Sequence, residues 1–209
     1  MIKYLVENKA DLNSKDFNKN YPVHLVSGRV NNFEILEYLV ENKADLNVKG
    51  FRNNTVLHLE CSTENFSLEK IKYLIENKAD LNIPNKESNA PLHRVCNNKN
   101  ISLELVQYLL ENKADLTKTN EHRKSPLFIA LENSNVQLKV IKYLVENKSD
   151  LNLSDINRST AFHYASLNEI SIEILRFLVE SKCNPNSTTN TILLLYISCP
   201  KIVRSRQKL

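Results

Sequence analysis

The stretch YLVENKADLN, Tyr38 to Asn47, decides how this chain folds, because it recurs with small changes along the sequence. Each copy opens on an aromatic residue, and these aromatics are Tyr4, Tyr38, Tyr73, Tyr108, Tyr143 and Phe177. Successive aromatics are 34 or 35 residues apart. A second motif, an apolar residue followed by histidine, keeps the same period at His24, His58, His93 and His163, with Phe128 in the fourth place. Two motifs that share one period predict a tandem array of a single structural unit.

The segment ahead of each ADLN-type motif has the pattern of an amphipathic helix. In the second copy, Ile35, Leu36 and Leu39 recur at helical spacing, and Glu34 and Glu37 fall on the other face. The apolar–histidine step lies in a shorter helix before it, and a short polar link joins the two. This predicts an antiparallel helical hairpin, followed by a polar, turn-rich connector of about eight residues.

The first helix of each unit is expected to begin just before the apolar–histidine step. Thr55, Ser125 and Thr160 stand at that point in three units, and their hydroxyls are predicted to cap the helix N-terminus. Tyr21 and Ala90 stand there in two others and have no hydroxyl close to the backbone. Those two helix ends are therefore expected to be weaker.

This order of helix, short turn, helix and connector resembles the ankyrin-repeat family. The resemblance covers almost the whole chain, and the closest copies of that family's T-P-L-H signature are APLH from Ala90 to His93 and SPLF from Ser125 to Phe128. It implies an all-α repeat solenoid, an ankyrin-type stack of antiparallel helix hairpins joined by extended, hairpin-like connectors. About five full repeats flanked by partial ones are expected.

One departure from the family pattern falls at the end of the second helix. Where the family usually has glycine before the A-D step, this sequence has lysine, at Lys9, Lys43, Lys78, Lys113, Lys148 and Lys182. The preceding residue is asparagine in five of the six copies, as at Asn77. We expect this asparagine to take over part of the helix-ending role of glycine.

The repeats also suggest how the chain is divided. An ankyrin-repeat domain is expected over residues 1–198 and a basic C-terminal tail over 199–209. The expected units are a partial repeat at 1–15, full repeats near 16–49, 50–84, 85–119, 120–154 and 155–188, and a degenerate end at 189–198. Because the chain opens inside a second helix, the apolar Ile2, Leu5 and Val6 lack a partner helix. We favour a slice of a longer protein over an N-terminal end that is covered from elsewhere.

Composition excludes several classes of function. Only two glycines, Gly28 and Gly50, are present, so no glycine-rich loop can hold a phosphate. The longest apolar run, 192–197, is far shorter than the about 20 residues that cross a bilayer. The formal net charge of +4 arises in the last nine residues, which hold four cations and no acid: Lys201, Arg204, Arg206 and Lys208. The body therefore lacks the basic surplus of a nucleic-acid-binding protein, and neither nucleic acid nor a membrane span is expected.

The cysteines and histidines are interpreted as structural. Four cysteines are too few for a disulfide scaffold and no secretory signal opens the chain, which favours the cytoplasm, with the nucleus as the alternative. Equivalent residues of stacked units lie about 8–10 Å apart, whereas zinc ligands lie about 2.0–2.1 Å from one ion. The pairs of His58 with Cys61 and His93 with Cys96 are therefore not expected to bind a metal. The ankyrin resemblance implies that the repeat histidines hydrogen-bond between neighbouring repeats.

Enzyme activity is not expected either, because no nucleophile, base and orienting acid can be assembled from the sequence. The in-phase aspartates and glutamates recur in every unit, as scaffolding residues do, and no cofactor or metal is implied.

Residues that vary between units while the frame stays fixed are the candidate contact residues for a protein partner. Aligning the copies gives Phe17, Asn18, Asn20, Phe51, Arg52, Asn54, Lys86, Glu87, Asn89, Glu121, His122, Lys124, Ile156, Asn157 and Ser159. They are expected on connector tips along one extended concave surface, with first-helix positions beside them. Exposed aromatics and arginines are typical anchors of protein interfaces.

Three functions stay open at this point. The preferred one is a non-catalytic adaptor, a monomer or part of a longer chain, that binds another protein on this surface. The second is a spacer or targeting segment of a longer multidomain protein whose activity lies elsewhere. The third follows from the resemblance alone: ankyrin proteins can be hydroxylated at the asparagine that closes the ADLN-type motif, a place taken here by Asn13, Asn47, Asn82 and Asn152 and interrupted by Thr117.

Overall fold

A computed structural model describes residues 8, 10–28, 32–167 and 172–185. The expectations about the apolar residues near the N-terminus, the run at 192–197 and the tail at 199–209 lie outside these residues. Within them, the secondary structure consists of helices joined by turns, with no strand.

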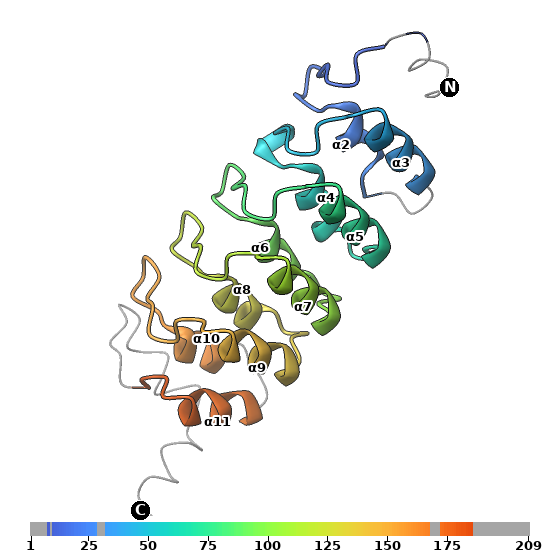
Figure 1. Ribbon diagram of the computed structural model, residues 1–209. Helices are drawn as coiled ribbons and strands as arrows, with labels where there is room; N and C mark the ends of the chain where they lie inside the picture. The colour runs from blue at the N-terminus through green and yellow to red at the C-terminus, as the bar shows by residue number, and fades with distance from the viewer. Residues whose placement is uncertain (1–7, 9, 29–31, 168–171, 186–209) are drawn as a thin grey trace, which may run out of the picture.

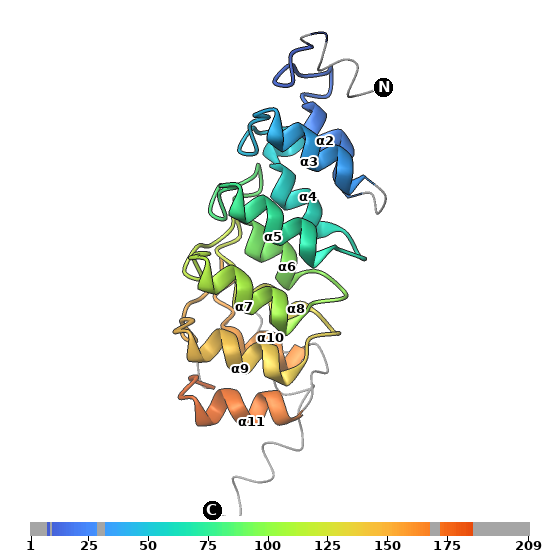
Figure 2. The ribbon, with the colours of Figure 1, turned by 45° about the vertical axis from the view of Figure 1, so that its right-hand side comes forward.

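The helices alternate between a short inner one and a longer outer one, and they form two rows along the stack (Figures 1 and 2). The inner row consists of α2 (Pro22–Val26), α4 (Val56–Ser62), α6 (Pro91–Cys96), α8 (Pro126–Glu132) and α10 (Ala161–Leu167). The outer row consists of α3 (Phe33–Glu41), α5 (Leu68–Glu76), α7 (Leu103–Glu111), α9 (Leu138–Glu146) and α11 (Ile172–Glu180). The connectors project from the inner row, on the side away from the outer helices (Figure 1). This is a helical repeat solenoid, as the sequence predicts.

The core runs along the stack between the two rows. Each inner helix packs on the next, α4 on α6, α6 on α8 and α8 on α10, and α7, α9 and α11 pack in the same way in the outer row. The predicted apolar stripe supplies the contacts, since Leu36, Leu39 and their counterparts Ile71 and Leu74 are buried. Each repeat thus buries its apolar face between its own two helices and against the neighbouring repeats.

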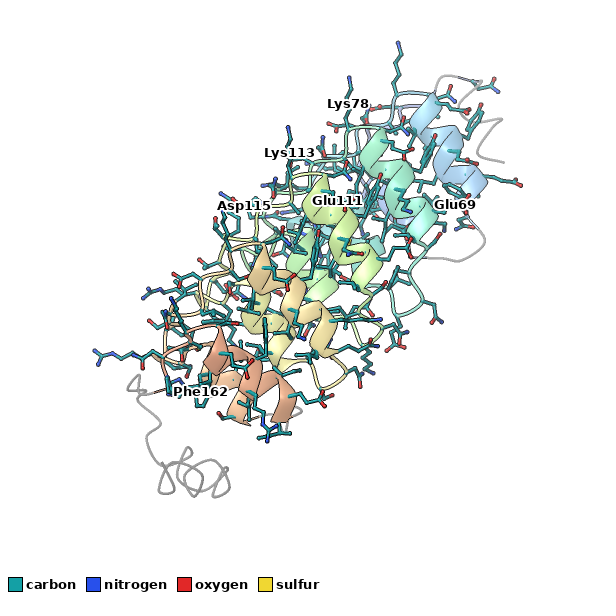
Figure 3. The ribbon with its side chains drawn as sticks, turned by 60° about the horizontal axis from the view of Figure 1, so that its bottom comes forward. Glu69, Lys78, Glu111, Lys113, Asp115 and Phe162 are labelled. Atoms are coloured by element: carbon teal, nitrogen blue, oxygen red, sulfur yellow. The ribbon has the colours of Figure 1, made fainter. Side chains whose placement is uncertain are left out.

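The ends of the outer helices follow the expectation only in part. Lysine itself adopts the left-handed backbone conformation, with φ between 65° and 71° at Lys43, Lys78, Lys113, Lys148 and Lys182. Figure 3 shows Lys78 and Lys113 at equivalent places along one edge of the stack. The preceding asparagine keeps a negative φ and contributes a side-chain bond, as where Asn77 Nδ2 donates to the Tyr73 carbonyl oxygen at 2.9 Å. The asparagine therefore assists the helix end but does not replace glycine, because it is the next residue that must turn left-handed.

The inner helices are also capped differently from the expectation. The hydroxyls of Thr55 and Thr160 each lie 2.8 Å from the Nδ1 atom of the histidine three residues on. That Nδ1 atom accepts the backbone N–H of the capping residue, at 3.1 Å between Thr55 and His58. The same bond forms at Tyr21 and Ala90, at 3.2 and 3.1 Å. The N-termini of α2 and α6 therefore have the same histidine bond as those of α4 and α10, and they lack only the threonine hydroxyl.

Candidate interaction surface

Each connector ends in a five-residue turn that we call a finger; the fingers are residues 16–20, 50–54, 85–89, 120–124 and 155–159. The turn is closed by two backbone hydrogen bonds, which in the third finger run from Asn85 N–H to Asn89 O at 2.9 Å and from Ser88 N–H to Asn85 O at 3.0 Å. The other four fingers have the same two bonds. The residue at the fourth place, such as Ser88 or Arg123, has a positive φ. The five fingers therefore share the same closure, and the second differs at its tip, where Arg52 at the third place also has a positive φ, of 55°.

The first side chain of a finger fixes the turn from inside. Asn85 Oδ1 accepts the backbone N–H groups of Glu87 and Asn89, both at 3.0 Å. Asn120 and Asp155 accept the equivalent pairs of N–H groups in the next two fingers, and Asp16 accepts one in the first. Such side-chain-to-backbone bonds stabilise tight turns.

Neighbouring fingers are tied to each other and to the inner helices. Lys86 N–H donates to the Arg52 carbonyl oxygen at 2.9 Å, and Glu121 N–H to the Glu87 carbonyl oxygen at 3.0 Å. The Nε2 atoms of His58 and His93 donate to the carbonyl oxygens of the last residue in the next finger, at 2.9 and 3.2 Å. The fingers are therefore held as one rigid row on the inner helices.

These contacts require neutral histidines. Because Nδ1 accepts a backbone N–H while Nε2 donates to a carbonyl oxygen, His24, His58 and His93 each carry their single proton on Nε2. Burial lowers the pKa of all three below the usual value, and that of His58 and His93 to about 4. In the fourth repeat, Phe128 fills the place of histidine, is buried, and lies against the Tyr164 ring with centroids 5.2 Å apart.

Three of the residues predicted from the sequence are the large exposed apolar side chains of the fingers. Phe17 is fully exposed, and Phe51 and Ile156 are 58% and 53% exposed. All three occupy the second place of their finger. Asn18, Lys86, Glu121, His122 and Asn157 are exposed on the fingers as well. Together with Arg52, whose side chain is 60% exposed, these eight side chains form the accessible part of the predicted set.

Four other predicted residues are turned toward the stack. Asn54 Oδ1 accepts from Asn85 Nδ2 at 2.9 Å, and Asn89 Oδ1 accepts from Asn120 Nδ2 at 3.1 Å. Asn20 Oδ1 accepts the backbone N–H of Phe51 at 3.0 Å. Asn89 and Ser159 are buried. These four residues join or fill the spaces between fingers and leave little surface for a partner.

The remaining predicted residues form ion pairs along the row of fingers. Glu87 lies 3.4 Å from Arg52 and 3.0 Å from Arg94 of α6, so that one carboxylate joins two guanidinium groups. Lys124 pairs with Glu132 at 2.5 Å and its ammonium lies 5.0 Å from the centroid of the Tyr164 ring. The Tyr164 hydroxyl in turn donates to Asp155 at 2.6 Å.

The sequence predicts first-helix positions beside the fingers without naming them, and the structure identifies them as the residue just after each histidine or Phe128. It is occupied by Leu25, Leu59, Arg94, Ile129 and Tyr164. Leu25 and Leu59 join Phe51 in lining a shallow hollow of about 190 Å³ at the N-terminal end of the row. The signal was present, because this position varies from repeat to repeat just as the finger tips do.

The asparagines that close the ADLN-type motifs form a ladder between repeats. Asn47 Oδ1 accepts the backbone N–H of Asp80 at 2.8 Å, and Asn82 Oδ1 accepts that of Asp115 at 2.7 Å. Thr117 interrupts the ladder, because its hydroxyl donates instead to Asp115 at 2.6 Å and lowers the pKa of that carboxyl.

The cysteines of the described residues are buried. Cys61, Cys96 and Cys183 are buried free thiols there, and burial raises the pKa of each. In the same residues no three histidine, cysteine, aspartate or glutamate side chains are grouped so that they could hold a metal ion. None of the helices in the described ranges is long and apolar enough to cross a membrane.

Helix hairpins stacked in register, with variable tips on a constant frame, define a helical repeat protein of the kind that binds other proteins. A family model for ankyrin repeats (3 copies) matches residues 1–85, 24–120 and 92–189. The chain therefore belongs to the ankyrin-repeat family, whose repeats generally serve as non-enzymatic protein–protein interaction modules. A comparison with curated proteins finds no match.

Proposed function

We propose that this chain is a non-catalytic adaptor that binds a protein partner along its fingers and the adjoining inner-helix positions. The observation that carries the proposal is the placement of Phe17, Phe51 and Ile156, large apolar side chains exposed at the same place of three fingers whose backbones are fixed. An unbound molecule gains nothing from exposing them, whereas a partner would bury them.

The rigid frame favours binding because little order has to be gained on association. The fingers are already fixed by turn bonds, finger-to-finger bonds and the histidines. A preorganised surface loses less conformational entropy when it binds, and more of the contact energy therefore remains as affinity. The hollow formed by Leu25, Phe51 and Leu59 could receive an apolar side chain of the partner.

Five further features belong to this proposal. The division into a repeat domain at 1–198 and a tail at 199–209 stays a prediction, as does the repeat count. A cytoplasmic or nuclear location, a monomeric state or membership of a longer chain, and the absence of a cofactor are proposed with it.

The test is a quantitative pull-down from cells that express the protein, read by mass spectrometry. It compares the unaltered chain with a finger variant that combines Phe17→Ala, Phe51→Ala and Ile156→Ala. The matched control combines Ile172→Ala and Val179→Ala on α11, which also remove exposed apolar side chains, 46% and 44% exposed, but lie on the outer row.

The proposal requires a partner that the unaltered chain and the control retain and the finger variant loses. A partner retained equally by all three would place the interface elsewhere. If no partner is captured, the alternative gains support, that of a spacer or targeting segment within a longer protein.

A further inference from the structure

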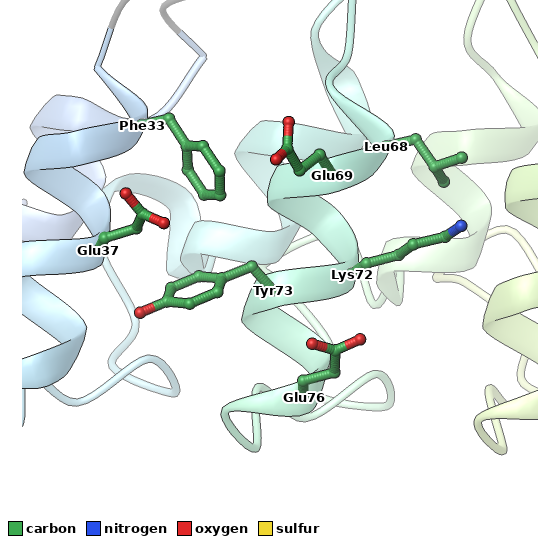
Figure 4. Close-up of a pocket in the computed structure, with 7 residues that line it drawn as sticks. All are labelled: Phe33, Glu37, Leu68, Glu69, Lys72, Tyr73 and Glu76. Carbon is green, nitrogen blue, oxygen red and sulfur yellow. The ribbon is translucent and has the colours of Figure 1, made fainter.

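A second hollow, which we call the α3–α5 groove, lies on the opposite side of the stack, between the outer helices α3 and α5. It encloses about 630 Å³. Phe33 and Tyr73 form its aromatic part, with ring centroids 5.5 Å apart and the rings nearly perpendicular. Glu37 of α3 and Glu69 of α5 lie beside these rings (Figure 4). Aromatic faces framed by carboxylates are the surroundings that a cationic side chain prefers.

We call the contact between two neighbouring outer helices a seam. The equivalent place at the next seam shows which group such surroundings bind. Between α5 and α7, the Lys72 ammonium lies 5.2 Å from the centroid of the Tyr108 ring and 3.5 Å from the Glu104 carboxylate. Between α9 and α11, Lys142 lies 5.6 Å from the centroid of the Phe177 ring. In both seams the cation comes from the residue just before the aromatic of the preceding outer helix.

The α3–α5 seam has the same acceptors but not the cation. Tyr73 corresponds to Tyr108 and Glu69 to Glu104, one repeat earlier. The position that supplies Lys72 and Lys142 is occupied by Glu37. The seam therefore places a second carboxylate where its counterparts place an ammonium group.

Carboxylates surround Tyr73 on the α3 side of the hollow. Burial raises the pKa of Tyr73, and the nearby charges of Glu41 and Glu37 raise it further. Lys72 lines the same hollow, but its side chain points away from Tyr73, toward α7 (Figure 4). In the ranges that the structure describes, Glu37 and Glu69 form no ion pair.

We propose that the α3–α5 groove binds a lysine or arginine side chain from a basic segment of a partner protein, in the place that Lys72 occupies at the next seam. The ring of Tyr73 would face the cation, and Glu37 and Glu69 would pair with it. Because the groove lies in the outer row and the fingers project from the inner row, this site is independent of the finger surface. One chain could then hold two partners at once.

The test titrates the full chain with an amidated peptide of alternating lysine and alanine. Binding is monitored by ¹H–¹⁵N NMR of the chain, at low and at physiological ionic strength. Shifts are expected to concentrate on α3 and α5. Glu37→Lys should place an internal cation over Tyr73 and weaken binding about tenfold or more. Glu69→Gln, which removes one carboxylate, should weaken binding several-fold.

The matched control is Glu146→Lys, which makes the same change of charge on the outer helix α9, away from the groove. It should change the affinity by less than about twofold, because general electrostatic attraction is screened by salt. Thermal unfolding of Glu37→Lys, with a midpoint at or above that of the unaltered chain, establishes that the variant is folded. Equal losses in Glu37→Lys and Glu146→Lys, shifts spread over the whole surface, or no binding at low salt would each overturn the proposal.

Discussion

Lysines take the left-handed backbone conformation at the ends of the five outer helices described. A residue with a Cβ atom is strained there by about 1–2 kcal/mol. The strain persists because the surrounding bonds determine the turn, as where Ala114 N–H donates to the Leu109 carbonyl oxygen at 2.9 Å. Local sequence could not predict this conformation, since lysine alone gives no signal for it.

Replacing one of these lysines by glycine should stabilise the fold. Lys113→Gly relieves the strain but raises the entropy of the unfolded chain, and the expected net gain is about 0.5–1 kcal/mol in the free energy of unfolding. Urea denaturation measures it. Lys139→Gly, at an exposed position inside α9, is the control and should lose about 1 kcal/mol. A loss at Lys113→Gly would contradict the strained turn.

The histidine that links finger and helix can be tested by a substitution that the chain itself contains. His93→Phe copies Phe128 of the next repeat and removes the bonds to Ala90 N–H and the Lys124 carbonyl oxygen. At a net value of about 1 kcal/mol for each bond, the unfolding free energy should fall by about 2 kcal/mol. An unchanged value would mean that these bonds contribute little.

At the scale of elements, the buried histidines should make stability depend on pH. The folded-state pKa of His58 and His93 is about 4, below the usual 6.5, so the unfolded chain binds more protons between these values. The contribution of these two neutral histidines to the free energy of unfolding is complete above pH 6.5 and is lost as the pH falls toward 4. The total loss is on the order of a few kcal/mol. Urea midpoints measured across this range should fall with pH, and less steeply in His93→Phe.

Asparagines also join neighbouring elements on the side of the helix-to-helix links. Asn133 is buried, and its Nδ2 atom donates to the carbonyl oxygens of Cys96 and Asn98 at 3.0 and 2.7 Å. Asn133→Ala leaves both acceptors without this donor and should cost about 1–3 kcal/mol of unfolding free energy. Asn135→Ala, two residues on and exposed, should stay within about 0.5 kcal/mol. Equal effects of the two changes would show that the link is not structural.

For the whole molecule, stability depends on the continuity of the stack. Leu74 is fully buried in α5, near the middle of the described repeats. Leu74→Ala should lower the unfolding free energy by about 2–5 kcal/mol, because it removes apolar contact and leaves a cavity. Calorimetry or urea denaturation checks this. A loss well below 1 kcal/mol would mean that the buried stripe is misassigned.

The sequence predicted those features that repeat within one unit. The stripe at Leu36 and Leu39 is local and periodic, so helices and their buried faces could be read from it. The role of Asn54 and Asn89 could not, because each bonds to an asparagine 31 residues away in the next finger. Variation alone cannot distinguish a tip that faces solvent, such as Phe51, from one that faces its neighbour.

The central claim is that a protein partner binds along the fingers. The most direct measurement places a photo-crosslinking phenylalanine analogue at Phe51, and separately at Val179 on α11, in cells that make the protein. A covalent adduct with a distinct protein is expected from position 51 and none from position 179. An adduct from position 179 alone, or the same adduct from both positions, would contradict it.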